Sequence, residues 1–292
     1  MTPRRMWVVL AGLAVAAALG AVGFVCAGIY NPAATLQHTA PVYWLLNLTM
    51  RQAVQRHARD IRAPTLDQPA LRARGALLYR AYCVQCHGAP GVAPDAFALG
   101  MMPLPANLAL TAREWQDPAE LYWVIKYGIK MSGMPAWEFR LSDADLWAVT
   151  GFVNTLPGLA PGDYQALPAA TKSAAATLSA LAAAPMAGPA ASGATTSSGQ
   201  ADSARGKIAL QQYACVTCHV IPGVVAAINP VGPSLAGIGS RKYLSGVLPN
   251  TPGNMLRWLQ APQQLAPGTA MPDLGVAPAD ARDMAAFLET LK

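Results

Sequence analysis

The pattern of apolar and polar residues begins with an unbroken apolar run over residues 6–30, which follows Arg4 and Arg5. A helix over this run would be roughly 37 Å long at about 1.5 Å per residue, enough to cross a hydrocarbon core of about 30 Å. The apolar region of a cleaved signal peptide is only about 7–15 residues long. We therefore predict an uncleaved transmembrane anchor over residues 1–30, with cleavage near residues 16–20 as the alternative.

The two arginines before the run, with none directly after it, place the N-terminus in the cytoplasm. The predicted localisation is a bacterial inner membrane, crossed once, with everything from Asn31 onward in the periplasm. A membrane-proximal stalk is predicted over residues 31–70. Residues 45–62 mix leucines with arginines, which predicts a basic helix. The pattern leaves open whether this helix lies on the membrane, against a partner subunit or in solvent.

Two amphipathic helices are predicted farther along the chain, over residues 142–156 and 279–291. Acidic residues begin both, with Asp143 and Asp145 in one and Asp280 and Asp283 in the other, where they favour the helix N-terminus. No stretch shows the period of a strand-rich protein. The predicted fold class is all-α.

An Ala-, Pro- and Ser-rich segment covers residues 161–203. It offers too little apolar area to offset the entropy of ordering, so we predict a flexible linker with a short helix over residues 172–184. The linker separates residues 71–160 from residues 204–292. Both flanking segments run through Ala-Arg-Gly, Cys-x-x-Cys-His, Met-Pro and a closing helix, which predicts two copies of one helical domain.

Charge narrows the choice of partner. The net charge of +6 and the isoelectric point near 9.2 suit an anionic protein surface or anionic lipid headgroups. The basic residues are scattered, without a patch interleaved with aromatic side chains. A nucleic acid is therefore not expected as a partner.

Four of the five cysteines form two Cys-x-x-Cys-His motifs, and Cys26 lies in the apolar run. This motif is the signature of haem c attachment, because both thiols reach the vinyl groups of one haem while the adjacent histidine ligates its iron. Zinc would need a tetrahedral ligand set, and a thioredoxin-like site would need a β-α-β setting. We predict two haem c groups, attached covalently at Cys83 and Cys86 and at Cys215 and Cys218, with His87 and His219 as iron ligands.

Methionine is the predicted sixth ligand of each iron, because the remaining histidines, His38 and His57, lie in the stalk. Met134 and Met271 each precede a proline in a predicted loop, at matching places after the two motifs. We assign Met134 to the first haem iron and Met271 to the second, with Met131 as the alternative in the first domain. Met101 and Met102 are the other methionines available in the first domain. In the second domain, Met284 is interpreted as a core residue and Met255 as the start of a helix.

On these residues, both segments resemble class I cytochrome c domains. In the first domain, Gly75, Tyr79 and the motif at residues 83–87 match the opening helix of that family. Residues 128–137 are similar to the ligand loop of many small bacterial members. The resemblance implies an anchor helix followed by two class I cytochrome c domains on a flexible linker.

In the second domain, residues 232–235 resemble the segment whose proline carbonyl accepts the ring N–H of the proximal histidine. The resemblance implies this role for Pro233 and implies haem propionate binding for Arg241 and Trp258. The first domain lacks this run, so the resemblance points only to Pro103 or Pro105 there. Residues 248–258, followed by Met271, are similar to the haem domain fused to subunit II of some bacterial terminal oxidases.

The predicted function is one-electron transfer in a periplasmic respiratory chain, without enzymatic activity, because two irons with His and Met ligands have no open position for a substrate. The expected partners are a terminal oxidase or a quinol-oxidising cytochrome complex, with membrane lipid around the N-terminal helix. The alternatives are the cytochrome subunit of a periplasmic dehydrogenase and a dihaem peroxidase. A haem-based gas sensor would require an output domain that the pattern does not show.

Overall fold

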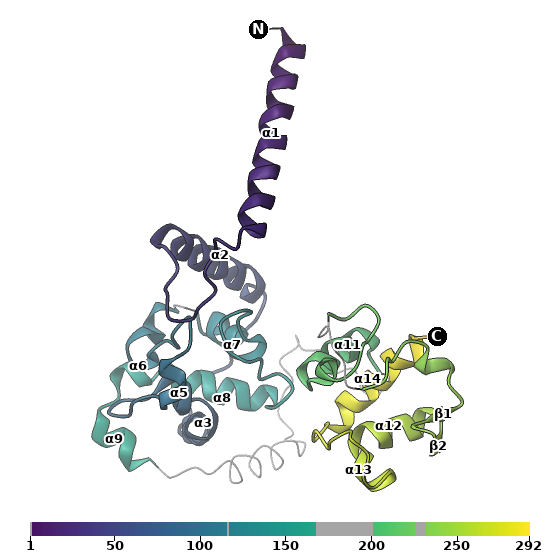
Figure 1. Ribbon diagram of the computed structural model, residues 1–292. Coiled ribbons are helices and arrows are strands. Elements are labelled where there is room, and N and C mark those ends of the chain that lie inside the picture. The colour runs from purple at the N-terminus through teal and green to yellow at the C-terminus, as the bar shows by residue number, and fades with distance from the viewer. Residues whose placement is uncertain (1, 116, 168–200, 226–231) are drawn as a thin grey trace. The chain divides into compact units, whose positions relative to one another are not determined.

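The computed structural model describes residues 2–115, 117–167, 201–225 and 232–292, so the helix predicted over residues 172–184 lies outside the described residues. The described chain consists of helices, loops and one hairpin of two short strands, each two residues long. The predicted all-helical class is confirmed. Figure 1 shows a long N-terminal helix followed by groups of short helices.

The N-terminal helix, α1 (Pro3–Cys26), is exposed at every position. Its mean hydropathy of 2.5 and its 24-residue length make it the one helix among the described residues that could cross a membrane. It begins at a proline, which suits the first turn because the first N–H groups of a helix have no intrahelical partner.

The described residues divide into two compact units. The first contains those up to residue 135, α1 included, and those from 145 to 167, and the second contains those from 136 to 144 and from 201 to 292. Between α1 and residue 167 the chain forms short helices: α2 (Ala40–Ala58), α3 (Pro69–Tyr82), α4 (Val84–His87), α5 (Ala96–Leu99), α6 (Leu108–Thr111), η1 (Ala112–Glu114), α7 (Pro118–Tyr127), α8 (Asp143–Val153), η2 (Leu156–Gly158) and α9 (Pro161–Ala166).

The opening helix of the first unit, α3, crosses the closing helix, α8, at Gly75. A Cβ atom on Gly75 would lie 2.0 Å from the carbonyl oxygen of Ala148, so only glycine allows this approach. One residue earlier, the Arg74 guanidinium binds the carboxylate of Asp145, which is fully buried. One turn later, the ring of Tyr79 lies 5.5 Å from that of Phe152. The Ala-Arg-Gly run of the sequence is therefore the crossing point of two helices.

The first unit extends farther than the sequence predicts. The linker expected from residue 161 instead begins with α9, whose Tyr164 is only 2% exposed. The Arg80 guanidinium lies 5.2 Å from the centre of that ring and donates a hydrogen bond to the Leu167 carbonyl. One buried aromatic residue thus supplies the apolar contact that the composition of the segment did not indicate.

The second unit repeats the plan of the first. Its elements are α11 (Ser203–Gln212), η3 (Cys215–Thr217), η4 (Ile238–Ser240), β1 (Tyr243–Leu244), β2 (Leu248–Pro249), α12 (Pro252–Gln260), α13 (Pro262–Leu265) and α14 (Pro278–Thr290). The two strands form an antiparallel hairpin in which Tyr243 faces Pro249 and Leu244 faces Leu248. Asp202 caps α11 by accepting hydrogen bonds from the N–H groups of Ala204 and Arg205.

Helices α11 and α14 cross at Gly206, where a Cβ atom would lie 1.9 Å from the carbonyl oxygen of Asp283. The preceding Arg205 forms ion pairs with Asp280 at 3.3 Å and Asp283 at 3.2 Å, and also with Glu138. The sequence interpretation placed these two aspartates as first-turn acids of the closing helix. Both are buried, and their main partner is the arginine of the opening helix.

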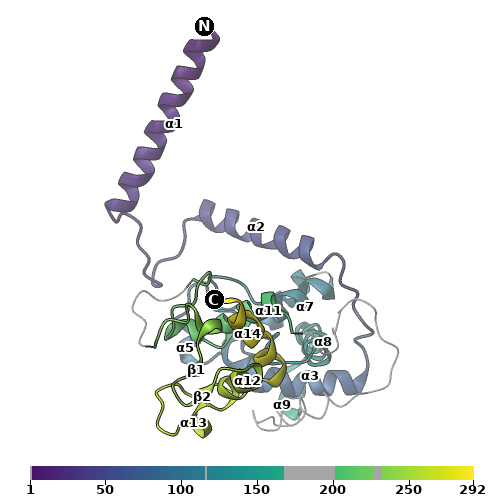
Figure 2. The ribbon, with the colours of Figure 1, turned by 90° about the vertical axis from the view of Figure 1, so that its right-hand side faces the viewer.

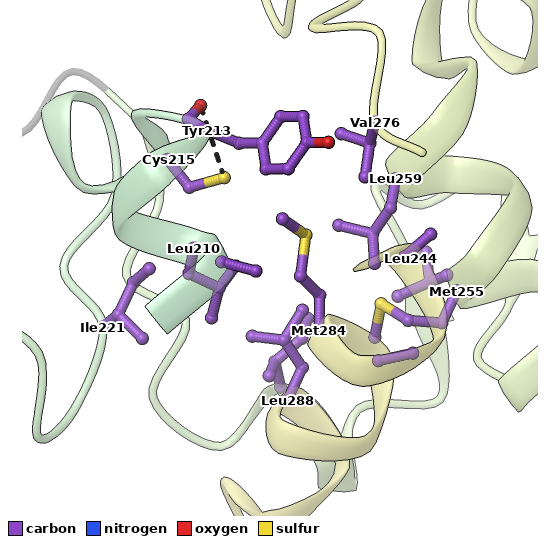
Figure 3. Close-up of a cluster of buried hydrophobic side chains, with 14 of the residues drawn as sticks. Leu210, Tyr213, Cys215, Ile221, Leu244, Met255, Leu259, Val276, Met284 and Leu288 are labelled. Carbon is purple, nitrogen blue, oxygen red and sulfur yellow. Dashed lines mark hydrogen bonds between the residues drawn. The ribbon is translucent and has the colours of Figure 1, made fainter. Parts of the chain in front are cut away.

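The core of the second unit lies between α11, α12 and α14. Figure 3 shows Leu210, Met255, Leu259, Met284 and Leu288 converging from these helices. Met284 is completely buried, as its place on an apolar stripe predicts. Phe139 belongs to the same cluster and is 7% exposed, which explains why the segment 136–144 groups with this unit.

Candidate haem-binding sites

The first Cys-x-x-Cys-His motif forms a single helical turn directly after α3. The amide of Cys83 donates to the Tyr79 carbonyl at 2.8 Å, and the amide of His87 donates to the Cys83 carbonyl at 3.0 Å. The Tyr79 hydroxyl donates to the carbonyl of Gly88 at 2.6 Å, where φ is +60°. These bonds fix the turn that brings the two thiols and the imidazole together.

A cavity of about 220 Å³ adjoins this turn. The two cysteines, His87 and Met134 all line it, so the structure brings the four predicted haem 1 residues to one space. Its remaining wall is almost entirely apolar, with no acidic side chain: Tyr79, Met101, Pro103, Leu104, Pro105, Ala106, Leu108, Trp115, Leu121, Val124, Ile125, Ile129, Ser132, Gly133, Pro135, Val149 and Val153.

The imidazole of His87 is oriented by a backbone carbonyl. Its Nδ1 lies 2.8 Å from the carbonyl oxygen of Ala106. The sequence resemblance pointed to Pro103 or Pro105 for this role, and that prediction is wrong, although both prolines line the cavity. An Nδ1–H donated to Ala106 leaves the lone pair of Nε2 free to bind a metal.

Burial controls the protonation of the first site. It raises the pKa of the Cys83 thiol to about 12, with a further contribution from Cys86, and it also raises the pKa of Cys86. Burial lowers the pKa of His87, and the hydrogen bond to Ala106 opposes this shift in part. The imidazole is therefore neutral at pH 7, which is the form that ligates metals.

The loop that carries Met134 is a tight reversal. Ile129 and Met134 form an isolated antiparallel bridge, with the Ile129 amide donating to the Met134 carbonyl at 3.2 Å. The Ser132 hydroxyl accepts a hydrogen bond from the Met134 amide at 3.2 Å. Met131, the alternative ligand in the sequence analysis, is 93% exposed and does not line the cavity.

A second thioether lines the same cavity. Met101 comes from the loop after α5, and its methyl group would lie 2.2 Å from a Cβ atom on Gly133. The side chain of Met101 therefore lies against the loop that carries Met134. From the sequence, Met101 is one of four methionines available in the first domain, and Met131 is preferred to it as the alternative. The structure makes Met101, and not Met131, the competitor for the position of the sixth ligand.

The second motif is held by a shorter turn. Ala214 adopts φ of +57°, and the amide of His219 donates to the Cys215 carbonyl at 3.0 Å. Burial raises the pKa of the Cys215 thiol to about 11. Gly232 lies against the motif, since a Cβ atom there would be 2.8 Å from Cε1 of His219. The ring of His219 therefore packs against the backbone of Gly232, where the side chain of any other residue would collide with it.

The predicted hydrogen bond of the second site is present. The Nδ1 of His219 lies 2.7 Å from the carbonyl oxygen of Pro233. Both residues line a cavity of about 270 Å³, again without an acidic side chain. The other lining residues are Leu210, Cys215, Cys218, Gly232, Leu235, Ile238, Arg241, Leu244, Ser245, Met255, Trp258, Leu259, Thr269, Ala270, Met271 and Leu288.

The loop that carries Met271 is fixed by two side chains. The Thr269 hydroxyl accepts a hydrogen bond from the Met271 amide at 3.4 Å, as Ser132 does for Met134. The amide group of Gln263 donates to the carbonyls of Thr269 and Met271 at 2.6 and 2.7 Å. Ser132, Thr269 and Gln263 were not predicted from the sequence. A serine or threonine does stand two positions before each Met-Pro pair, and this repeated pattern could have indicated the hydrogen bond to the methionine amide.

Arg241 and Trp258 line the second cavity together, as the resemblance implies. The guanidinium of Arg241 donates to the carbonyls of Ser234 and Ala236 at 2.6 and 3.1 Å, which fixes its position. Arg241 is exposed and Trp258 is half-buried. Their binding of haem propionates remains a prediction.

Both donor sets fit a haem. Each cavity joins two thiols, one oriented imidazole and a thioether, which are the groups that hold haem c. Their apolar walls match an apolar macrocycle. Among the described residues, no cluster of three or more His, Cys, Asp or Glu side chains has the arrangement that zinc requires.

The two haem-binding halves of the chain match two different protein families. Residues 70–153 match the family model described as cytochrome C oxidase, cbb3-type, subunit III. Residues 203–292 match the model described as cytochrome c. No curated protein and no solved structure matches the chain. The oxidase description thus attaches to the first half, whereas the sequence analysis placed an oxidase-like feature in the second.

Proposed function

We propose that this chain, whose two cytochrome c domains hold two haem c groups and make it an electron-transfer protein, carries single electrons at a membrane to or within a terminal oxidase complex. The predicted pair of haem c groups is confirmed by the two family matches. A haem iron supplies one-electron chemistry by changing between Fe(II) and Fe(III). The observation that carries the proposal is the meeting of an oriented histidine and a loop methionine in each cavity.

Each domain would bind its haem through four residues. Cys83 and Cys86, and likewise Cys215 and Cys218, would form the thioether links. The iron ligands would be His87 with Met134 in the first domain and His219 with Met271 in the second. With one histidine and one methionine bound, the iron would have no open position for a substrate and would supply electron exchange alone.

The surrounding residues would tune the two sites. The carbonyls of Ala106 and Pro233 accept the Nδ1–H of the two histidines, which fixes the ring and increases the basicity of Nε2. Around a bound haem, the apolar walls would keep water away, which would favour the less charged Fe(II) state and raise the reduction potential. A dihaem peroxidase needs one iron with an open position, and the thioether in each cavity argues against that alternative.

The proposed location is a bacterial inner membrane, crossed once by α1, with both haem domains in the periplasm. Support comes from the length and hydropathy of α1 and from the arginines that precede its apolar run. The proposed partner is a terminal oxidase, supported by the description of the family matched by residues 70–153. A quinol-oxidising complex would then supply electrons, and a periplasmic dehydrogenase is the competing donor.

The ligand assignment is tested by single substitutions in the full-length haem protein. Met134→Ala and Met271→Ala should each remove one of two methionine-to-iron charge-transfer bands of the ferric protein. Met131→Ala, in the same loop as Met134, is the matched control and should remove neither band. If Met101→Ala or Met255→Ala removes a band instead, the assignment is wrong for that domain.

The partner assignment is tested by purifying the tagged protein from its native membranes in mild detergent, with haem staining of the fractions. An intact oxidase that oxidises the reduced dihaem protein is the expected companion. A substrate dehydrogenase in its place, reducing the protein on addition of its substrate, would contradict the oxidase proposal while leaving the electron-carrier function intact.

A further inference from the structure

Helix α2 has two ends of opposite character. Its first half carries six exposed apolar residues: Val42, Tyr43, Trp44, Leu45, Leu46 and Leu48. We call these six residues the apolar end of α2. The exposed fractions of Trp44 and Leu45 are 65% and 55%, and no residue from Ala40 to Met50 is buried. A soluble domain rarely leaves so dense a group of large apolar side chains in water.

The second half of α2 is fixed to the first unit. Val54 and Ala58 are buried, and α2 packs against α7. The ring of His57 stacks on that of Trp123 at 5.5 Å. Figures 1 and 2 both show α2 beside the short helices of this unit, among them α7.

Arg51 marks the change between the two halves. It forms an ion pair with Glu114 and lies 5.2 Å from the centre of the Trp115 ring. It is also the first charged residue after Arg5, since no Asp, Glu, Lys or Arg occurs between them. The charge-free part of the chain therefore contains α1 from Met6 onward, the following loop and the whole apolar end of α2. It stops at Arg51, where α2 meets the folded unit.

The absence of charged residues between Arg5 and Arg51 indicates that lipid covers the apolar end of α2. A segment without charge, continuous with a helix that could span a membrane, is suited to lipid. Tyr43 and Trp44 are the aromatic types that gather at the headgroup level. A protein partner would more commonly meet apolar residues surrounded by charged ones, whereas Asn47 and Thr49 are the polar residues of this end of α2 and no charged residue precedes Arg51 in the helix.

We propose that the apolar end of α2 is a second membrane contact, inserted into the lipid interface, while the rest of α2 holds the first haem domain. The proposal rests on α1 being a membrane anchor. Helix α7, on which α2 packs, contributes Leu121, Val124 and Ile125 to the wall of the first cavity. The contact therefore fixes the orientation of the first haem domain toward the bilayer.

The test uses the full-length haem protein in bilayer discs of phosphatidylethanolamine and phosphatidylglycerol. The photoreactive residue p-benzoylphenylalanine replaces Val15, Leu45 or Gln55, one position per preparation. Val15 reports on α1, Leu45 on the apolar end, and Gln55 is the control on the exposed surface of the second half of α2. An unchanged haem spectrum verifies folding of each variant, and mass spectrometry identifies the photoproducts.

Lipid adducts at positions 15 and 45, with none at position 55, are the expected result. An adduct at position 15 but not at position 45 would overturn the second contact and leave the anchor in place. Equal labelling at positions 45 and 55 would also overturn it, as would a product at position 45 that joins two copies of the chain without lipid. Absence of adducts at both 15 and 45 would remove the anchor together with this inference.

Discussion

Gly75 and Gly206 stand at equivalent places, and each lets an opening helix touch the backbone of a closing helix. The arginine before each glycine binds a buried aspartate of that closing helix. These close approaches explain why Ala-Arg-Gly occurs twice in the sequence. The repeated glycine and arginine therefore hold the opening and closing helices together, and the opening helix positions the Cys-x-x-Cys-His turn that follows it.

Replacing either glycine with alanine should destabilise its own domain. The added Cβ would meet a carbonyl oxygen at 2.0 Å in Gly75→Ala and at 1.9 Å in Gly206→Ala, which forces the helices apart. Overpacking of this kind costs about 1–3 kcal/mol or more. Urea unfolding followed by haem absorbance measures the loss. Gly162→Ala and Gly253→Ala are the controls, because nothing lies within 4 Å of a Cβ at either position; equal losses in all four variants would contradict the account.

Removal of Arg205 should be costly as well. Arg205→Ala leaves the carboxylates of Asp280 and Asp283, which are 6% and 12% exposed, without their cationic partner. Breaking a buried ion pair in this way costs about 3–5 kcal/mol, and the exposed edge of Arg205 favours the lower value. Arg282→Ala, on the exposed side of α14, is the matched control in the same denaturation experiment. A loss no larger than that of the control would show that the ion pairs do not stabilise the crossing.

The elements show which features the sequence could predict and which it could not. The Cys-x-x-Cys-His motifs and the Met-Pro pairs are short patterns of neighbouring residues, so the sequence alone indicated the two cysteines, the histidine and the methionine that line each cavity. The carbonyl of Pro233 was predicted from a short run, whereas that of Ala106 was missed because no residue type marks a backbone acceptor. The two ends of α2 were also missed, since composition alone does not show which half of a helix packs against a domain.

The loops carrying Met134 and Met271 share a hydrogen bond from the methionine amide to a hydroxyl oxygen two residues earlier. Ser132→Ala and Thr269→Ala should each weaken the loop by about 1 kcal/mol, the usual net worth of such a bond. We expect the methionine-to-iron band of the affected domain to disappear at a lower temperature than in the parent protein. Ser132→Thr and Thr269→Ser should restore the parent temperature; if they behave like the alanine variants, the hydroxyl is not what fixes the loop.

Across the whole molecule, α1 and the haem domains are separable in structural terms. No side chain of α1 is buried, so its removal exposes no apolar core. A chain that begins at Asn31, exported by a cleavable signal peptide, should keep both haems and their spectra but lose its resistance to extraction from membranes by alkaline carbonate. If the shortened chain resists extraction as the full chain does, α1 is not the principal anchor. Loss of haem from the shortened chain would show that α1 supports the fold.

The central claim is that each of two haem irons is ligated by one histidine and one methionine. It is tested most directly by near-infrared magnetic circular dichroism of the oxidised full-length protein, scaled to its haem content. The account predicts two low-spin ferric haems per chain, both with the methionine-to-iron charge-transfer band. A high-spin haem, a bis-histidine band or a single methionine band for two haems would contradict it.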